Sequence, residues 1–140
     1  PKYAVEAPGV PRLFNVTNHQ LTADQIEDAR QRWDIVDVVD LDEELKAVWA
    51  NIEVGSAASL IFDRLWQRST HADVIVVQGE YGATLTLVSM LRTAGRRVVY
   101  ASTAREVTEC QEPDGSVTTV HRFRHRGFLE YGDSCRTVPG

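Results

Sequence analysis

The sequence predicts an α/β fold, with a Rossmann-like, mostly parallel sheet, helices on both faces and a C-terminal β-hairpin. Short apolar runs rich in β-branched residues alternate with segments of helical periodicity, which is the order typical of parallel sheets. The run Val74–Val77 is apolar at every position, as expected for a central strand covered on both faces. In the last third of the chain, polar and apolar residues alternate around a turn at residues 112–116, which indicates a hairpin.

The first half of the chain is expected to hold two strands and three helices. The first strand is predicted at Leu13–Thr17. Thr22 and Gln25 form a predicted capping box, with Thr22 as the N-cap, and open a helix. We expect a second strand at Ile35–Val39, a short acidic helix at Leu41–Ala50, and a third helix from the apolar spacing between residues 57 and 66.

The second half continues the alternation and then changes character. We expect a third strand at Asp73–Gln78, a helix at Gly82–Ala94 closed by Gly95, and a fourth strand at Arg97–Ala101. The hairpin strands are predicted at Val107–Gln111 and Val117–Arg124. Residues 1–11 are therefore predicted to be a flexible lead-in, residues 12–131 one Rossmann-like domain with its hairpin at about 103–126, and residues 132–140 a C-terminal tail.

Length and composition indicate one domain, since 140 residues that are 43% hydrophobic suffice for a core. No apolar stretch is long enough to span a membrane and the N-terminal segment lacks a signal-peptide core, so we expect a cytoplasmic protein without a membrane partner. A net charge of −5 argues against binding to long nucleic acid. Acidic residues gather in residues 23–53, whereas His121–Arg126 contains none, and this split suits a small, multiply charged anion.

Polar residues follow the predicted strands at the edge where parallel strands end. Because the carboxyl ends of parallel strands share one edge, these residues are expected to lie together as a ligand site. The loop between the third strand and its helix contains two glycines, and its backbone N–H groups are expected to cradle a phosphate. The predicted ligand-binding residues are Asn18, Gln78, Gly79, Glu80, Tyr81, Gly82, Ala83, Thr84 and Thr103.

Each of these residues also has a structural interpretation. His19 could simply shape the turn into the first helix, and the glycines could only relieve backbone strain. Trp33, Trp49 and Trp66 are expected in the core, with stacking on a base as an alternative for Trp49. Arg122, Arg124 and Arg126 would share one face of a strand, where they either balance the acidic half of the chain or bind an anion.

Motifs of other catalytic classes are missing from the sequence. There is no GK[ST], HExxH, GxSxG or CxxC pair, so we expect neither a metal nor a cofactor. Catalysis without a metal requires a general acid/base and an electrostatic clamp. The predicted catalytic residues are His19 as first choice for acid/base and His125 as second, with Arg105 and Arg124 as the clamp.

Four segments resemble one known family. Leu13–Thr22 resembles its opening strand followed by His and Leu-Thr, and Val77–Thr84 looks like its Q-G-[DE]-[FY]-G-A-T signature. Tyr100–Arg105 is similar to its Y-A-T-T-x-R segment, with Ser102 where Thr is expected, and Phe123–His125 resembles its late F-R-H. By this resemblance, which covers roughly residues 12–131, the chain is identified as a member of the small CRISPR-associated Csx proteins, in the family numbered twenty.

The resemblance implies a CARF-like domain that binds a cyclic oligoadenylate, most plausibly cyclic tetra-adenylate. It also implies a ring nuclease that switches off type III CRISPR signalling, by attack of the ribose 2′-OH without a metal. A homodimer with a shared pocket would suit such a symmetric ring. The alternatives are a sponge or sensor that binds the ring without cleaving it, and an interaction module whose hairpin docks on a CRISPR effector. The sequence leaves the ring size, the identity of the catalytic His or Arg, and the oligomeric state open.

Overall fold

The computed structural model describes residues 9–51 and 56–132. Residues 1–8 of the predicted lead-in and 133–140 of the predicted tail lie outside the described residues. The elements, in chain order, are β1 (Arg12–Val16), α1 (Ala23–Trp33), β2 (Asp37–Asp40), α2 (Glu43–Ala50), α3 (Ser56–Arg68), β3 (Val74–Val77), α4 (Tyr81–Thr93), β4 (Arg97–Gln111) and β5 (Val117–Glu130). None of the described helices is both long and apolar enough to cross a membrane.

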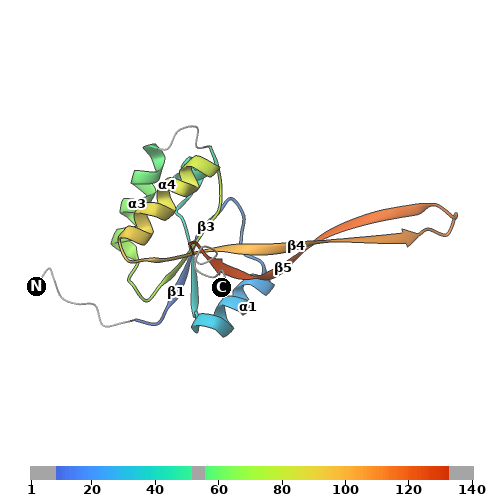
Figure 1. Cartoon of the computed structure of the whole chain (residues 1–140), viewed down its shortest axis with the longest axis horizontal. Helices are drawn as coiled ribbons and strands as arrows, with labels where there is room; N and C mark the ends of the chain where they lie inside the picture. The colour runs from blue at the N-terminus through green and yellow to red at the C-terminus, as the bar shows by residue number, and fades with distance from the viewer. Residues whose placement is uncertain (1–8, 52–55, 133–140) are drawn as a thin grey trace, which may run out of the picture.

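The five strands form one sheet in the order β2-β1-β3-β4-β5. The first four of these pair in parallel, and β5 pairs with β4 in antiparallel. Figure 1 shows α1 on one side of the sheet and α3 and α4 on the other. The prediction of an α/β fold with a mostly parallel sheet and helices on both faces is confirmed.

Two apolar clusters cover the two faces of the sheet. On the α1 face, Leu13, Val74 and Val76 pack with Ala29 and Phe128. On the other face, residues of α2, α3 and α4 pack over the alternate side chains of the same strands. Every residue of β3 is fully buried, so the all-apolar run Val74–Val77 does mark the centre of the sheet.

The three tryptophans differ in burial. Trp49 on α2 is only 2% exposed, which confirms that it belongs to the core. The alternative prediction, that its ring stacks on a base, is therefore wrong. Trp33 is partly buried against the α1-face cluster. Trp66 is 47% exposed, so its predicted place in the core is wrong. It stacks with Phe62, and the Arg96 guanidinium lies 4.2 Å from its ring centre.

The local signals at the helix ends are confirmed. Thr22 caps α1, and the reciprocal bonds of a capping box with Gln25 are both present. Gly95 follows α4 with a φ of 79°, a left-handed conformation that glycine adopts without steric cost. Gly115 in the hairpin turn has a φ of 89° for the same reason. The predicted helices and turns therefore lie where their capping and turn residues indicate.

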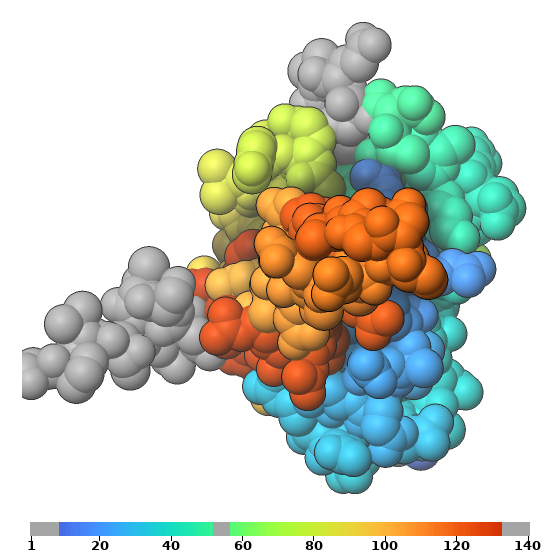
Figure 2. Space-filling view, turned by 90° about the vertical axis from the view of Figure 1, so that its right-hand side faces the viewer, coloured from blue at the N-terminus to red at the C-terminus, as the bar shows by residue number. Residues whose placement is uncertain are grey.

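The fourth strand is much longer than predicted. β4 does not end at Ala101 but continues to Gln111, and it pairs with β5 from Val99↔Glu130 out to Gln111↔Val117. The expected hairpin is therefore the outer part of one continuous two-stranded ribbon, not a separate addition to the core. Figure 1 shows this ribbon projecting far beyond the helices, and Figure 2 shows its outer part standing in front of the body.

Candidate functional site

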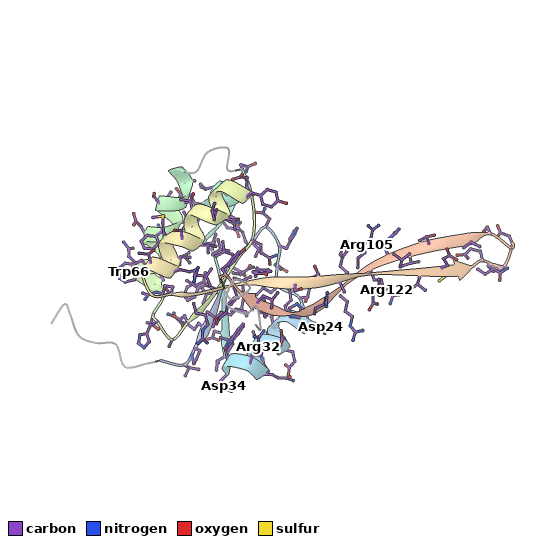
Figure 3. All side chains as sticks on the ribbon, viewed as in Figure 1. Asp24, Arg32, Asp34, Trp66, Arg105 and Arg122 are labelled. Atoms are coloured by element: carbon purple, nitrogen blue, oxygen red, sulfur yellow. The ribbon has the colours of Figure 1, made fainter. Side chains whose placement is uncertain are left out.

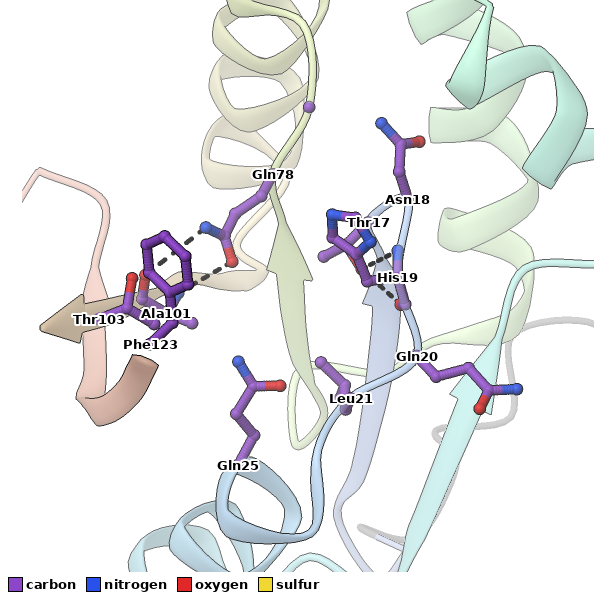
Figure 4. A pocket seen from close by; sticks show the side chains of 11 residues that line it. Thr17, Asn18, His19, Gln20, Leu21, Gln25, Gln78, Ala101, Thr103 and Phe123 are labelled. Atoms are coloured by element: carbon purple, nitrogen blue, oxygen red, sulfur yellow. Dashed lines mark hydrogen bonds between the residues drawn. The ribbon is translucent and has the colours of Figure 1, made fainter. Parts of the chain in front are cut away.

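The strand order reverses direction between β1 and β3. The chain moves from β1 outward to β2, and from β3 outward to β4 on the other side. Ligands of open α/β sheets bind at such a reversal, outside the carboxyl ends of the strands. A pocket of about 400 Å³ lies there, lined by Thr17, Asn18, His19, Gln20, Leu21, Gln25, Gln78, Gly79, Ala101, Thr103 and Phe123. We call it the edge pocket, and Figure 4 shows it from close by.

The loop after β1 is held by a buried amide that the sequence analysis missed. Asn15 is 2% exposed, and its Nδ2 donates to the His19 carbonyl over 2.8 Å and to Asp40 Oδ1 over 3.0 Å. The Thr17 hydroxyl donates to Asn15 Oδ1 over 2.7 Å and accepts the N–H of His19 over 3.2 Å. These bonds fix the backbone of His19, while its exposed ring lies in the edge pocket. The one signal in the sequence was an amide between the apolar residues Phe14 and Val16.

Gln78 is a structural part of the pocket wall. Its Oε1 accepts the Ala101 N–H over 3.1 Å, and its Nε2 donates to the Ala101 carbonyl over 3.5 Å. Backbone pairing between β3 and β4 ends at Val76↔Val99, so the side chain continues the ladder for one more step. Gln78 therefore keeps β4 beside β3 at the point where β4 leaves the body.

Gly79 lies in close contact with Trp49. A Cβ at this position would lie 2.8 Å from three atoms of the indole ring. The indole Nε1 donates to the Gln78 carbonyl over 3.0 Å, which fixes the ring beneath the loop. Position 79 therefore requires glycine because of its neighbour, and its backbone φ is not in the left-handed region.

The first free N–H groups of α4 donate to a side chain of the same loop, so the predicted phosphate cradle is corrected. Glu80 is the N-cap, and its carboxylate accepts the N–H groups of Gly82 over 2.9 Å and Ala83 over 2.8 Å. The bond from Ala83, and then that from Gly82, lowers the pKa of Glu80. These two amides therefore donate within the chain, and a phosphate brought to them would meet a negative charge. A glutamate at this place in the loop was the overlooked signal.

Two other predicted ligand-binding residues belong to a second pocket. Tyr81 and Thr84 line a cavity of about 370 Å³ on the other side of Gln78 and Gly79, together with Leu85, Tyr100 and Tyr131. The Tyr131 hydroxyl donates to the Val77 carbonyl over 2.6 Å. Burial, and then the neighbouring Tyr100, raises the pKa of Tyr131. Within the described part of the chain, the buried Thr84 hydroxyl oxygen has no hydrogen-bond partner.

The predicted catalytic residues of the hairpin do not line the edge pocket. The His125 side chain is 7% exposed, and its Nε2 lies 2.8 Å from Asp28 Oδ2 on α1. His125 therefore ties the ribbon to α1. Arg105 bonds His121 Nδ1 over 3.0 Å, and Arg124 pairs with Glu106 over 3.4 Å.

The ribbon geometry explains why Arg105 and Arg124 do not form the predicted clamp within one chain. Arg105 pairs with Phe123 and Arg124 pairs with Ala104, so the two arginines lie on opposite faces of the ribbon. A bulge leaves Arg126 as an extra residue between His125, which pairs with Thr103, and Gly127, which pairs with Ser102. Strand alternation is interrupted there, so Arg126 does not continue the regular face of Arg122 and Arg124. Figure 3 shows Arg105 and Arg122 on the ribbon outside the body.

Phe123 is a pocket residue that the sequence analysis did not select. It is 75% exposed, and it lies beside Thr103 at the rim of the edge pocket. An exposed aromatic ring at a pocket rim offers a flat surface on which a nucleobase can stack. The structure thus brings together Asn18, His19, Gln78, Gly79 and Thr103 from the prediction, and it adds Phe123 and Gln25.

Fold and pocket together define an α/β protein with a ligand-sized pocket at the carboxyl edge of its sheet. The chain belongs to the family described as the Uncharacterized protein MJ1673 family, whose model matches residues 11–129. It is 28% identical over 127 residues to Uncharacterized protein MJ1673 of Methanocaldococcus jannaschii, a match that covers 87% of this chain and 98% of that protein. No solved structure matches the chain significantly.

Proposed function

We propose that the edge pocket binds cyclic oligoadenylate, specifically cyclic tetra-adenylate, and that the chain cleaves it as a ring nuclease that switches off type III CRISPR signalling in the cytoplasm. One observation carries the proposal. The four segments that resemble the Csx family each contribute to the same pocket, through residues 17–21, 78–79, 101, 103 and 123. The strand order and the helices on both faces support the Rossmann-like, CARF-related part of the proposal.

The proposed reaction needs no metal. The ribose 2′ oxygen attacks the adjacent phosphorus, the bond from phosphorus to the 5′ oxygen breaks, and a 2′,3′-cyclic phosphate end remains. His19 takes the proton from the 2′-OH and returns it to the departing 5′ oxygen. Asn18 and Thr103 supply neutral donors for the phosphate oxygens, and Phe123 stacks on an adenine. Alignment of the 2′ oxygen with the leaving oxygen contributes further to the rate.

The pocket size supports a homodimer as part of the proposal. A volume of about 400 Å³ is at the low end of the range of ~300–1,000 Å³ for small-molecule sites. One chain would therefore enclose one nucleotide of the ring. A second chain, related by a two-fold axis, would enclose another.

A sponge that binds the ring without cleaving it is the second candidate. Among the described residues that line the edge pocket, His19 is the one titratable side chain, and the clamp arginines lie outside it. Charge that develops in the transition state would then meet only neutral donors. This favours slow cleavage or binding alone.

A single-turnover assay with radiolabelled cyclic tetra-adenylate in EDTA separates these functions. We expect a linear product with a 2′,3′-cyclic phosphate end, and His19→Ala should slow its formation by about 10²-fold or more. His71→Ala is the matched control. His71 is also exposed, but it lies between α3 and β3, at the amino ends of the parallel strands and away from the edge pocket. Intact ring that stays bound to the wild type would indicate the sponge. No binding would reject the ligand altogether.

A further inference from the structure

The outer part of the ribbon, which we call the outer ribbon, consists of residues 105–119. All residues from Arg105 to Thr119 are exposed, on both strands and in the turn. An isolated two-stranded ribbon is only marginally stable in water, and it normally needs a third strand or a packed surface. Figures 1 and 2 show that no other part of the described body covers this ribbon.

The two faces of the ribbon differ in polarity. Side chains alternate between faces along a strand, and directly paired residues share a face. The pairs Arg105↔Phe123, Val107↔His121 and Gln111↔Val117 therefore place the exposed large hydrophobic residues between 105 and 123 on one face. Val107, Val117 and Phe123 are 56%, 61% and 75% exposed, respectively. We call this the apolar ribbon face; it consists of residues 105, 107, 109, 111, 117, 119, 121 and 123.

The opposite face of the ribbon is polar, and two of its charged side chains bond to each other. It carries Glu106, Thr118, Arg122 and Arg124 with the partly buried Val120. Arg124 and Glu106 form an ion pair there. A partner that covered this face would therefore bury less exposed apolar surface.

The apolar ribbon face is complementary in charge to a reversed copy of itself. Arg105, Val107 and Glu109 follow one another along this face of β4. If two ribbons lie face to face in opposite directions with Val107 at the two-fold axis, Arg105 lies opposite Glu109 of the partner subunit. The same contact forms a second time by symmetry. Between residues 105 and 124, the arginines at 105, 122 and 124 lie near the body together with Glu106, and the acids at 109, 112 and 114 lie toward the tip.

We propose that the apolar ribbon face is the interface between two copies of this chain, packed antiparallel about a two-fold axis near Val107. The contact buries Val107 and Val117, covers one face of the Phe123 ring, and pairs Arg105 with Glu109 of the partner subunit. Because Phe123 also lines the edge pocket, the partner's ribbon covers the rim of that pocket. This inference deepens the proposed function, on whose homodimer it rests, by placing the interface on the ribbon, and its test requires no ligand.

Charge reversal tests the interface directly, by sedimentation velocity over a range of concentrations without nucleotide. We expect the wild type to be a dimer. Glu109→Arg and Arg105→Glu should each raise the dimer Kd about tenfold or more, because each brings like charges together twice. The double variant Arg105→Glu with Glu109→Arg should restore the wild-type Kd, since the exchanged charges are again complementary.

Arg122→Glu is the matched control on the opposite face, and it should leave the dimer Kd unchanged. Circular dichroism establishes that each variant is folded. A monomeric wild type would overturn the proposal, whatever other protein or nucleic acid the ribbon then binds. Equal weakening in the control, or no recovery in the double variant, would overturn it as well. Because the assay contains no nucleotide, its failure leaves the nuclease assay to be judged separately.

Discussion

Replacing Gly79 by alanine places a methyl carbon 2.8 Å from the Cε2, Cζ2 and Nε1 atoms of Trp49. The indole has little room to yield, since it is 2% exposed and is held by its bond to the Gln78 carbonyl. Overpacking of this kind costs about 1–3 kcal/mol. Displacement of the ring would also lose the indole–carbonyl bond, which contributes about 1 kcal/mol. We therefore expect Gly79→Ala to lower the free energy of unfolding by about 2–4 kcal/mol.

Urea unfolding of Gly79→Ala and Gly82→Ala, compared with the wild type, measures this effect. A Cβ at Gly82 would lie 3.4 Å from the Glu80 carboxylate oxygens, an ordinary contact, and its φ is not left-handed. Alanine there should be neutral or stabilise by up to about 1 kcal/mol, because it restricts the unfolded chain. Equal changes in the two variants, or a Gly79→Ala protein as stable as the wild type, would refute the role assigned to Trp49.

Three further substitutions each remove a side-chain hydrogen bond that holds a loop or the ribbon near the site. Asn15→Leu should lower the free energy of unfolding by about 1–3 kcal/mol. It should also speed hydrogen exchange of the His19 amide, because the loop loses the buried amide that bonds it. An unchanged exchange rate would contradict this. His125→Leu should cost about 1–2 kcal/mol, since its bond to Asp28 holds the ribbon on α1; equal stability in urea would argue against that anchor. Tyr131→Phe should cost about 1 kcal/mol at neutral pH. Burial raises the folded pKa of Tyr131 above its ordinary value of 10.0, so its contribution is full below pH 10.0 and is lost as the pH rises through the folded pKa. The difference in stability between wild type and variant should therefore shrink in alkali; a constant difference would contradict the pKa direction.

The fold could be predicted from the sequence because its signals are local. The capping pair Thr22 and Gln25, the glycine at position 95 and the apolar run Val74–Val77 each depend on a few neighbouring residues. The end of β4 could not be predicted in this way. Residues 102–111 have no core to face, and they extend the strand because β5 pairs with them from elsewhere in the chain.

The candidate site was predicted in part. Residues that directly follow β1 and β3 do meet at the edge pocket, because parallel strands end at one edge. Arg105 was assigned to it because β4 was expected to end at Ala101, and His125 was assigned as the second choice of acid/base. Their actual positions depend on the bulge at Arg126 and the register of the ribbon. The cap formed by Glu80 was missed because glutamate is not among the common N-cap residues.

Mapping amide chemical shifts in ¹H–¹⁵N spectra during titration with cyclic tetra-adenylate is the decisive test of ligand binding at the edge pocket. We expect the largest shifts at residues 17–21, 78–79, 101, 103 and 123, which line the edge pocket. Shifts concentrated on Leu85, Tyr100 and Tyr131 in the second pocket, or none at saturating nucleotide, would contradict it.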